Sequence, residues 1–180
     1  MRGRTFVRAF ATIAGFCFLL QLTIAQGAHA QNVRTIFFVR HADKVSDDTD
    51  APLSDPGHRR AECLANTLAD EHIDQIFVSD LQRTQQTAAP LAEKLHAKPI
   101  AIPLSTPDRL VDAIRASKAA HVLVVWHDMT LPKIMQALGA PAITPIGHTE
   151  YDRFFILTLT DDQANPQPRF AALRYCDSTK

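Results

Sequence analysis

The stretch Thr35-Ile36-Phe37-Phe38-Val39-Arg40-His41-Ala42-Asp43-Lys44 decides the fold of this chain. Its first half is apolar and rich in β-branched and aromatic residues, which is typical of a strand covered on both faces in a parallel sheet. The apolar run stops at Arg40 and His41. In open α/β sheets, ligands bind beyond the carboxyl ends of such strands. The sequence therefore predicts a functional site where this strand ends.

Strand and helix patterns alternate along the rest of the chain. Apolar residues at spacings of three and four predict helices after Pro56, at 81–95, after Thr106 and at 130–138. Short apolar runs predict strands at 76–78, 99–103, 122–126, 154–159 (buried) and 169–175 (at an edge), while the acidic segment 43–55 reads as a surface loop. This order favours an α/β fold, a three-layer sandwich with a mostly parallel mixed sheet between helices.

Residues 1–30 have the composition of a secretory signal peptide. Arg2, Arg4 and Arg8 precede an uncharged apolar span, and Ala28 and Ala30 are the small residues expected before a cleavage site. The apolar span is shorter than the roughly 20 residues that a membrane-crossing helix needs. We expect cleavage after Ala30, a domain at 31–180, no stable membrane insertion, and a periplasmic or secreted location. An uncleaved anchor is the alternative.

The charge and cysteine content limit the partners of the processed chain. Three of the 19 Lys and Arg residues precede Ala30 and none of the 19 Asp and Glu residues does, so the remainder has a formal charge of −3. Nucleic acid is therefore not an expected partner. Cys63 and Cys176 remain after cleavage, and an oxidising compartment permits a disulfide between them. A buried thiol and a separate tail thiol are the alternative.

Three of the predicted strands end in residues that suit the binding of an anion or an attack on it. These are Arg40 and His41 after the first strand, Ser79 and Arg83 after the second, and His127 after strand 122–126. If the strands are parallel neighbours, these ends meet, and nearby helix N-termini add positive potential. A phosphate ester fits this combination of charges. For each residue alone, a salt bridge or a structural hydrogen bond is the simpler alternative.

At these positions the chain resembles the histidine phosphatase superfamily, which has the phosphoglycerate-mutase-like fold. Arg40-His41-Ala42 is similar to the family's Arg-His-Gly, residues 79–88 (SDLQRTQQTA) to its Ser-x-x-x-Arg-Thr-x-Gln-Thr-Ala, and residues 124–127 (VVWH) to the strand that ends in its second histidine. The resemblance covers about residues 35–160. It implies that His41 is the nucleophile and that Arg40, Arg83 and His127 bind phosphate, without a metal or a cofactor. Ser79 and Lys44 are further candidates for substrate binding.

Three carboxylates are candidates for the acid that protonates the leaving group: Asp128, Asp43 and Asp108. Asp128, which stands where the larger acid phosphatase branch of the family has its proton donor, ranks first because a strand-end position next to a phosphate ligand puts its carboxyl near the leaving oxygen. Asp43 ranks second, and Asp108 is a further candidate. The structural alternatives are that Asp128 caps the next helix, that Asp43 pairs with Lys44, and that Asp108 is a first-turn acid.

Trp126 departs from the family pattern, which usually has glycine at this position. The indole either narrows the pocket or packs away from it. We expect an exported phosphomonoesterase that forms a phosphohistidine on His41 and acts on a small phosphorylated substrate or a phosphoprotein. The alternatives are a phosphoglycerate-mutase-type phosphotransferase and a catalytically silent phosphate-binding or phosphoprotein-binding module, although a binding module needs no nucleophile.

Overall fold

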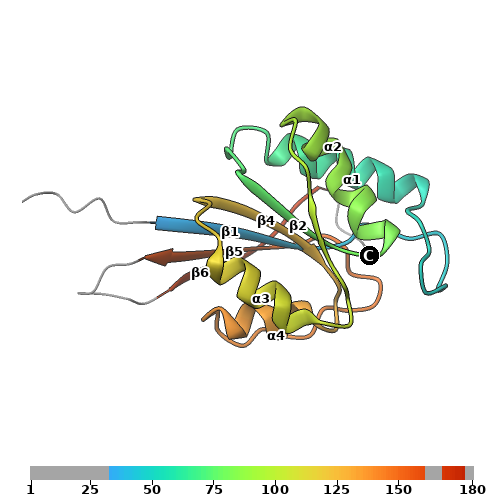
Figure 1. Ribbon diagram of the computed structural model, residues 1–180. Helices are drawn as coiled ribbons and strands as arrows, with labels where there is room; N and C mark the ends of the chain where they lie inside the picture. Colours follow the sequence, from blue (N-terminus) through green and yellow to red (C-terminus); the bar gives the residue numbers. More distant parts are fainter. Residues whose placement is uncertain (1–32, 161–167, 177–180) are drawn as a thin grey trace, which may run out of the picture. The chain divides into compact units, whose positions relative to one another are not determined.

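The computed structural model describes residues 33–160 and 168–176 (Figure 1). The predicted signal peptide lies outside these residues. Their elements follow each other in the order β1 (Val33–Arg40), α1 (Asp55–Thr67), β2 (Gln75–Ser79), α2 (Gln82–Lys94), β3 (Ile100–Ile102), α3 (Pro107–Ala116), β4 (His121–Trp126), α4 (Leu131–Ala137), β5 (Arg153–Thr160) and β6 (Arg169–Arg174). Within the described ranges, no helix is both long enough and apolar enough to cross a bilayer.

One mixed sheet has the strand order β3-β2-β4-β1-β5-β6. The pairs β1–β4, β2–β4 and β2–β3 are parallel, and the pairs β1–β5 and β5–β6 are antiparallel. The predicted three-layer α/β fold is therefore confirmed. Because β2, β4 and β1 are adjacent and parallel, their carboxyl ends lie at the same edge of the sheet.

Both faces of β1 are covered, as its continuous apolar run predicts. Phe37 and Val39 pack in the cluster that includes side chains of α1 and α2, whereas Ile36 and Phe38 pack in the cluster that includes α3 and α4. Figure 1 shows these two helix pairs on opposite sides of the sheet. Trp126 is fully buried in the second cluster, so its indole belongs to the core.

The start of α1 braces the loop that follows β1. Ser54 caps the helix, because its hydroxyl accepts a hydrogen bond from the Gly57 N–H (3.2 Å), and Pro56 occupies the first turn. A Cβ at Gly57 would lie 2.1 Å from the Asp43 carbonyl oxygen, so only glycine fits here. The Ser54 N–H also donates to that carbonyl (2.9 Å). This contact fixes the backbone two residues after His41.

The two C-terminal strands are less buried than the central ones. The prediction that residues 154–159 are buried holds for Phe154, Phe155 and Leu157 and is wrong for Ile156 and Leu159, which are partly exposed. The reason is position, since β5 is followed in the sheet only by β6, an edge strand with mostly exposed residues. The edge position predicted for β6 is confirmed.

Candidate active site

The carboxyl ends of β1, β2 and β4 bring the predicted site residues together. The His41 N–H donates to the Trp126 carbonyl (2.9 Å), which continues the β1–β4 pairing past the end of β1. The Ala42 N–H donates to the Thr87 hydroxyl on α2 (2.9 Å). The ring centroids of His41 and His127 are 5.3 Å apart. Two histidines from strands far apart in sequence therefore face one site.

His41 is held as a neutral ring with a defined proton position. Its Nδ1 lies 2.8 Å from the Ala42 carbonyl oxygen, which can only accept, so Nδ1 carries the proton. Burial is the main cause that lowers the pKa of His41 to about 2. The hydrogen bond to the Ala42 carbonyl raises this pKa, and the nearby positive charge of Arg40 lowers it further. Nε2 therefore has a free lone pair at neutral pH, as a nucleophile requires.

His127 is also neutral and lies between Arg83 and Ser79. Its Nδ1 is 3.3 Å from Arg83 Nη2, and its Nε2 is 2.8 Å from Ser79 Oγ. Burial lowers the pKa of His127 to about 3, and the positive charge of Arg83 acts in the same direction. Ser79 is fully buried behind the ring. The Ser79 hydroxyl contacts His127 and has no exposed surface, and its role in substrate binding stays a prediction.

Arg40 is buried and most of its donors are already used by the protein. Its Nη1 donates to the carbonyls of Gly147 (2.8 Å) and His148 (2.7 Å), and its Nη2 lies 3.1 Å from Asp128 Oδ2. The guanidinium also stacks on the Tyr151 ring, 4.2 Å from its centroid. Burial lowers the pKa of Arg40. The loop before β5 thus fixes this arginine, a role of that loop that the sequence analysis did not predict.

Two buried arginine N–H groups at the site have no hydrogen-bond partner in the described part of the chain. These are Nε of Arg40 and Nε of Arg83. The other Arg83 nitrogens contact the Thr49 carbonyl (2.8 Å) and His127. Leaving a buried donor unpaired costs about 1–3 kcal/mol, so such groups call for an explanation. An anion that accepts hydrogen bonds from both arginines would provide it.

The three candidate acids occupy different surroundings. Asp128 uses both carboxylate oxygens as acceptors, Oδ2 toward Arg40 and Oδ1 toward the Met129 N–H (2.9 Å). Asp43 accepts from Arg60 Nε (2.7 Å), so the alternative pairing with Lys44 is wrong. Asp108 is exposed in the first turn of α3. The alternative of a first-turn acid therefore holds for Asp108, whereas Asp43 and Asp128 each pair with an arginine instead of with Lys44 or a helix N-terminus.

Lys44 and His148 lie at the rim of the site. Lys44 Nζ donates to Asp47 Oδ1 (2.7 Å), so an exposed carboxylate already engages this predicted substrate-binding residue. The sequence analysis missed His148, an exposed side chain with Nε2 3.4 Å from Asp47 Oδ1 and Nδ1 4.0 Å from Asp128 Oδ2. In the described ranges, no three His, Cys, Asp or Glu side chains lie close enough to hold a metal ion.

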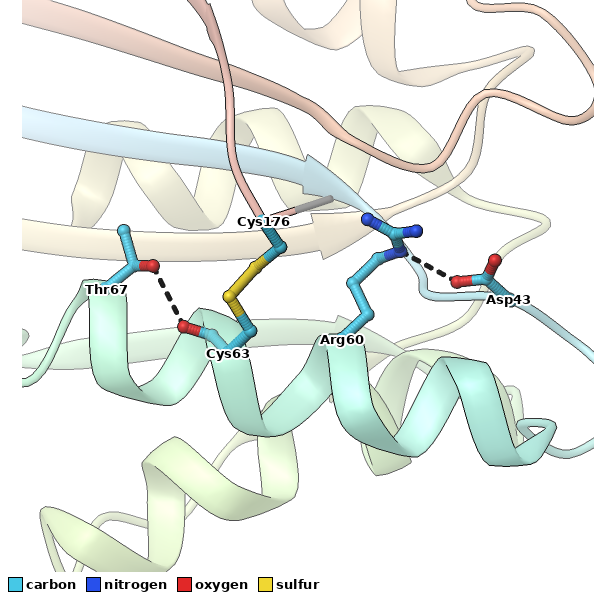
Figure 2. The surroundings of a disulfide bond; sticks show 5 residues. All are labelled: Asp43, Arg60, Cys63, Thr67 and Cys176. Atoms are coloured by element: carbon cyan, nitrogen blue, oxygen red, sulfur yellow. Dashed lines mark hydrogen bonds and ion pairs between the residues drawn. A yellow bond between two sulfur atoms is a disulfide. The ribbon is translucent and has the colours of Figure 1, made fainter. Parts of the chain in front are cut away.

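A disulfide joins α1 to the end of β6. Cys63 and Cys176 are bonded, with their Cα atoms 6.2 Å apart, so the first of the two alternatives from the sequence holds. Figure 2 shows Cys63 about one turn after Arg60, whose guanidinium binds Asp43. The disulfide therefore anchors the helix that braces the loop after His41.

Residues 36–110 match the model of the histidine phosphatase superfamily (branch 1), which is the family that the motifs resemble. A probable phosphoglycerate mutase GpmB of Yersinia enterocolitica is 33% identical over 75 residues, which are 38% of this chain and 35% of that protein. The fructose-2,6-bisphosphatase TIGAR B of Danio rerio is 51% identical over 39 residues, 22% of this chain and 15% of that protein. The chain thus spans about a third or less of the length of these relatives.

Solved structures share the fold over most of the chain. The protein histidine phosphatase SixA complexed with tungstate is 22% identical, with a TM-score of 0.59 over 78% of this chain and 96% of that one. A mycobacterial glucosyl-3-phosphoglycerate phosphatase is 15% identical, with a TM-score of 0.62 over 80% of this chain and 100% of that one. At these identities the likeness shows the fold alone.

Proposed function

We propose that this chain, whose fold and family match are those of the histidine phosphatase superfamily, hydrolyses phosphate monoesters through a phosphohistidine on His41. The observation that carries the proposal is the neutral His41 ring, which has its proton on Nδ1 and its lone pair on Nε2. A residue that only bound phosphate would instead offer a proton to the anion. This arrangement argues against the silent binding module.

The proposed reaction has two steps. His41 Nε2 attacks phosphorus in line with the ester oxygen, the N–P bond forms, the P–O bond breaks, and the departing oxygen takes a proton from solvent water. The positive charge that develops on the ring is stabilised by the Nδ1–H bond to Ala42. Water then attacks phosphorus, the N–P bond breaks, and inorganic phosphate leaves. Each step exchanges one ligand on phosphorus, which divides a difficult displacement into two easier ones.

The arginines supply the charge that this chemistry needs. The negative oxygens of a phosphate monoester repel a nucleophile until cations and hydrogen-bond donors neutralise them. Arg40 and Arg83 each keep a buried, unpartnered Nε–H beside the two histidines. We assign these donors, with His127, to the nonbridging oxygens. The proposed site works without a metal.

The substrate and the location belong to the same proposal. The sequence of residues 1–30 supports export and cleavage after Ala30, which implies a periplasmic or secreted enzyme. A small phosphorylated molecule and a phosphoprotein both present the group that the site would bind, and the fold likeness to a protein histidine phosphatase makes phosphoproteins worth testing. Nucleic acid is not proposed as a partner.

A trapping experiment on the purified chain 31–180 tests the mechanism. Rapid acid-free quenching with radiolabelled p-nitrophenyl phosphate is expected to leave label on His41, in a bond that is stable to alkali and labile to acid. His41→Gln is the control and should neither incorporate label nor turn over substrate. Label on another residue, or turnover by the control, would overturn the proposal. Return of the label to an added acceptor alcohol, rather than to water, would favour the mutase-type alternative.

A further inference from the structure

Two hydroxyl groups follow one another from the Nε2 side of His127, opposite the Nδ1 side that faces Arg83. Ser79 at the end of β2 and Thr84 in α2 are both fully buried, and their oxygens are 2.9 Å apart. We propose that Ser79 and Thr84 are positioning residues that let the single proton of His127 move from Nε2 to Nδ1 when phosphate binds. The inference rests on the proposed function, because it assigns phosphate to the site.

The proton of His127 in the free protein follows from its two neighbours. Arginine nitrogens only donate, so Nδ1 must accept from Arg83 Nη2 and carries no hydrogen. The ring is neutral and has one proton, which is therefore on Nε2. The Nε2–H donates to Ser79 Oγ (2.8 Å).

The hydroxyl hydrogens can then be placed as well. Ser79 Oγ accepts from His127 and from the Leu81 N–H (3.2 Å), so its own hydrogen goes to Thr84 Oγ1. Thr84 Oγ1 also accepts from the Ser79 N–H (3.1 Å) and donates to the Leu81 carbonyl (2.9 Å). Every hydrogen and both lone pairs of each hydroxyl are used. The free state is thus a closed network that runs from Arg83 to Leu81.

Phosphate requires the opposite proton position. His127 Nε2 is tied to a buried hydroxyl, so Nδ1 is the ring nitrogen that can meet a ligand. Phosphate oxygens accept hydrogen bonds, and a lone pair on Nδ1 would repel them. When the Arg83 guanidinium donates to phosphate instead of to the ring, Nδ1 must carry a hydrogen to contribute to binding.

The hydrogen bonds of the Ser79 and Thr84 hydroxyls can reverse direction at little cost in free energy. Ser79 would donate to Nε2, and Thr84 would donate to Ser79 Oγ across the same 2.9 Å contact. The Leu81 carbonyl loses the Thr84 hydroxyl but still accepts from the N–H groups of Thr84 (3.2 Å) and Gln85 (3.4 Å). The proton that leaves Nε2 goes to solvent water and Nδ1 takes up one proton from solvent water, so the net charge does not change. Only a hydroxyl can both accept and donate at the same place.

Nitrogen NMR of ¹⁵N-histidine-labelled protein at pH 7.5 tests this inference, since it distinguishes protonated from unprotonated ring nitrogens. We expect the His127 proton on Nε2 in the free wild type and on Nδ1 with saturating inorganic phosphate. Phosphate binding without a change in proton position, or with both nitrogens protonated, would overturn the switch and leave the proposed function standing. Failure of phosphate to bind would overturn both.

A matched pair of variants separates the effect of the Thr84 hydroxyl from the effect of the shape of its side chain. Thr84→Val keeps the shape of the side chain and removes the acceptor of the Ser79 hydroxyl hydrogen. The Ser79 hydroxyl should then donate to His127 Nε2, and the His127 proton should move to Nδ1 even in the protein without phosphate. Thr84→Ser keeps the hydroxyl and should keep the proton on Nε2. Because Thr84 does not touch His127, a merely structural role would leave the ring in its wild-type state. A wild-type proton position in folded Thr84→Val would overturn the inference.

Discussion

Two buried neutral histidines should make the folded chain sensitive to mild acid. The pKa values of His41 and His127 are lowered to about 2 and about 3, whereas a histidine in the unfolded chain titrates near 6.5. As the pH falls below about 6.5, the unfolded chain binds protons that the folded chain does not bind. The free energy of unfolding therefore decreases with acidification, and the decrease continues until the pH reaches the folded pKa values.

The size of this effect can be worked out between pH 7.5 and pH 5. At pH 7.5 each histidine is mostly neutral in the folded and in the unfolded chain, so its pH-dependent contribution to the free energy of unfolding is close to zero. The pH of 5 is about 1.5 units below the unfolded pKa and far above both folded values. At roughly 1.4 kcal/mol per pH unit, each ring therefore lowers the free energy of unfolding by about 2 kcal/mol. The two together cost about 4 kcal/mol, a large share of the roughly 5–15 kcal/mol that stabilises a typical domain.

Urea unfolding at the two pH values measures the effect. The matched control is the double variant His41→Gln with His127→Gln, which keeps polar side chains but cannot titrate in this range. All other titrating groups are common to both proteins, so the difference between them isolates the two rings. The wild type should lose about 4 kcal/mol more than the variant between pH 7.5 and pH 5, and each single variant about half of that. Equal losses would refute the burial of two neutral rings.

Three further changes test other parts of the structure. Replacing both Cys63 and Cys176 by serine opens a loop closed across 113 residues and should cost about 4–5 kcal/mol of unfolding free energy in urea; an unchanged midpoint would contradict this. A chelator should leave phosphatase activity intact and vanadate should inhibit it, because arginines supply the charge at the site, whereas loss with the chelator and recovery with zinc would contradict this. Asp128→Asn should lower hydrolysis of alkyl phosphate and p-nitrophenyl phosphate alike, by roughly 10-fold, because it weakens the support of Arg40. A loss confined to the alkyl ester, whose poorer leaving group needs the proton, would instead make Asp128 the acid.

The order of strands and helices and the position of the site could be predicted because both depend on local sequence patterns. The apolar run before Arg40 required two covered faces, and the structure covers both. His41, Arg83 and His127 each follow an apolar strand, and parallel strands have their carboxyl ends at one edge. Periodicity therefore placed these residues at strand ends, and the structure confirms the condition under which those ends meet, that the strands are parallel neighbours. The same local reasoning failed for Ile156 and Leu159, whose exposure depends on what lies beside β5.

Pairings between side chains could not be predicted in this way. Nearness in sequence suggested that Asp43 binds Lys44, but Arg60 reaches Asp43 from α1, and Lys44 turns to Asp47. A charged side chain can bind any opposite charge within reach, so the path of the chain decides the partner. The choice between a disulfide and two separate thiols at Cys63 and Cys176 was open for the same reason.

By itself, the sequence determined an α/β fold with an arginine and two histidines at the ends of buried strands. Only the tertiary structure decided how these groups are held: Arg40 by the carbonyls of Gly147 and His148, His41 by the Ala42 carbonyl, and His127 between Arg83 and a buried Ser79. The physical reason is that apolar periodicity depends on residues a few positions apart, whereas the proton on an imidazole depends on which donor or acceptor the folded chain places against each nitrogen.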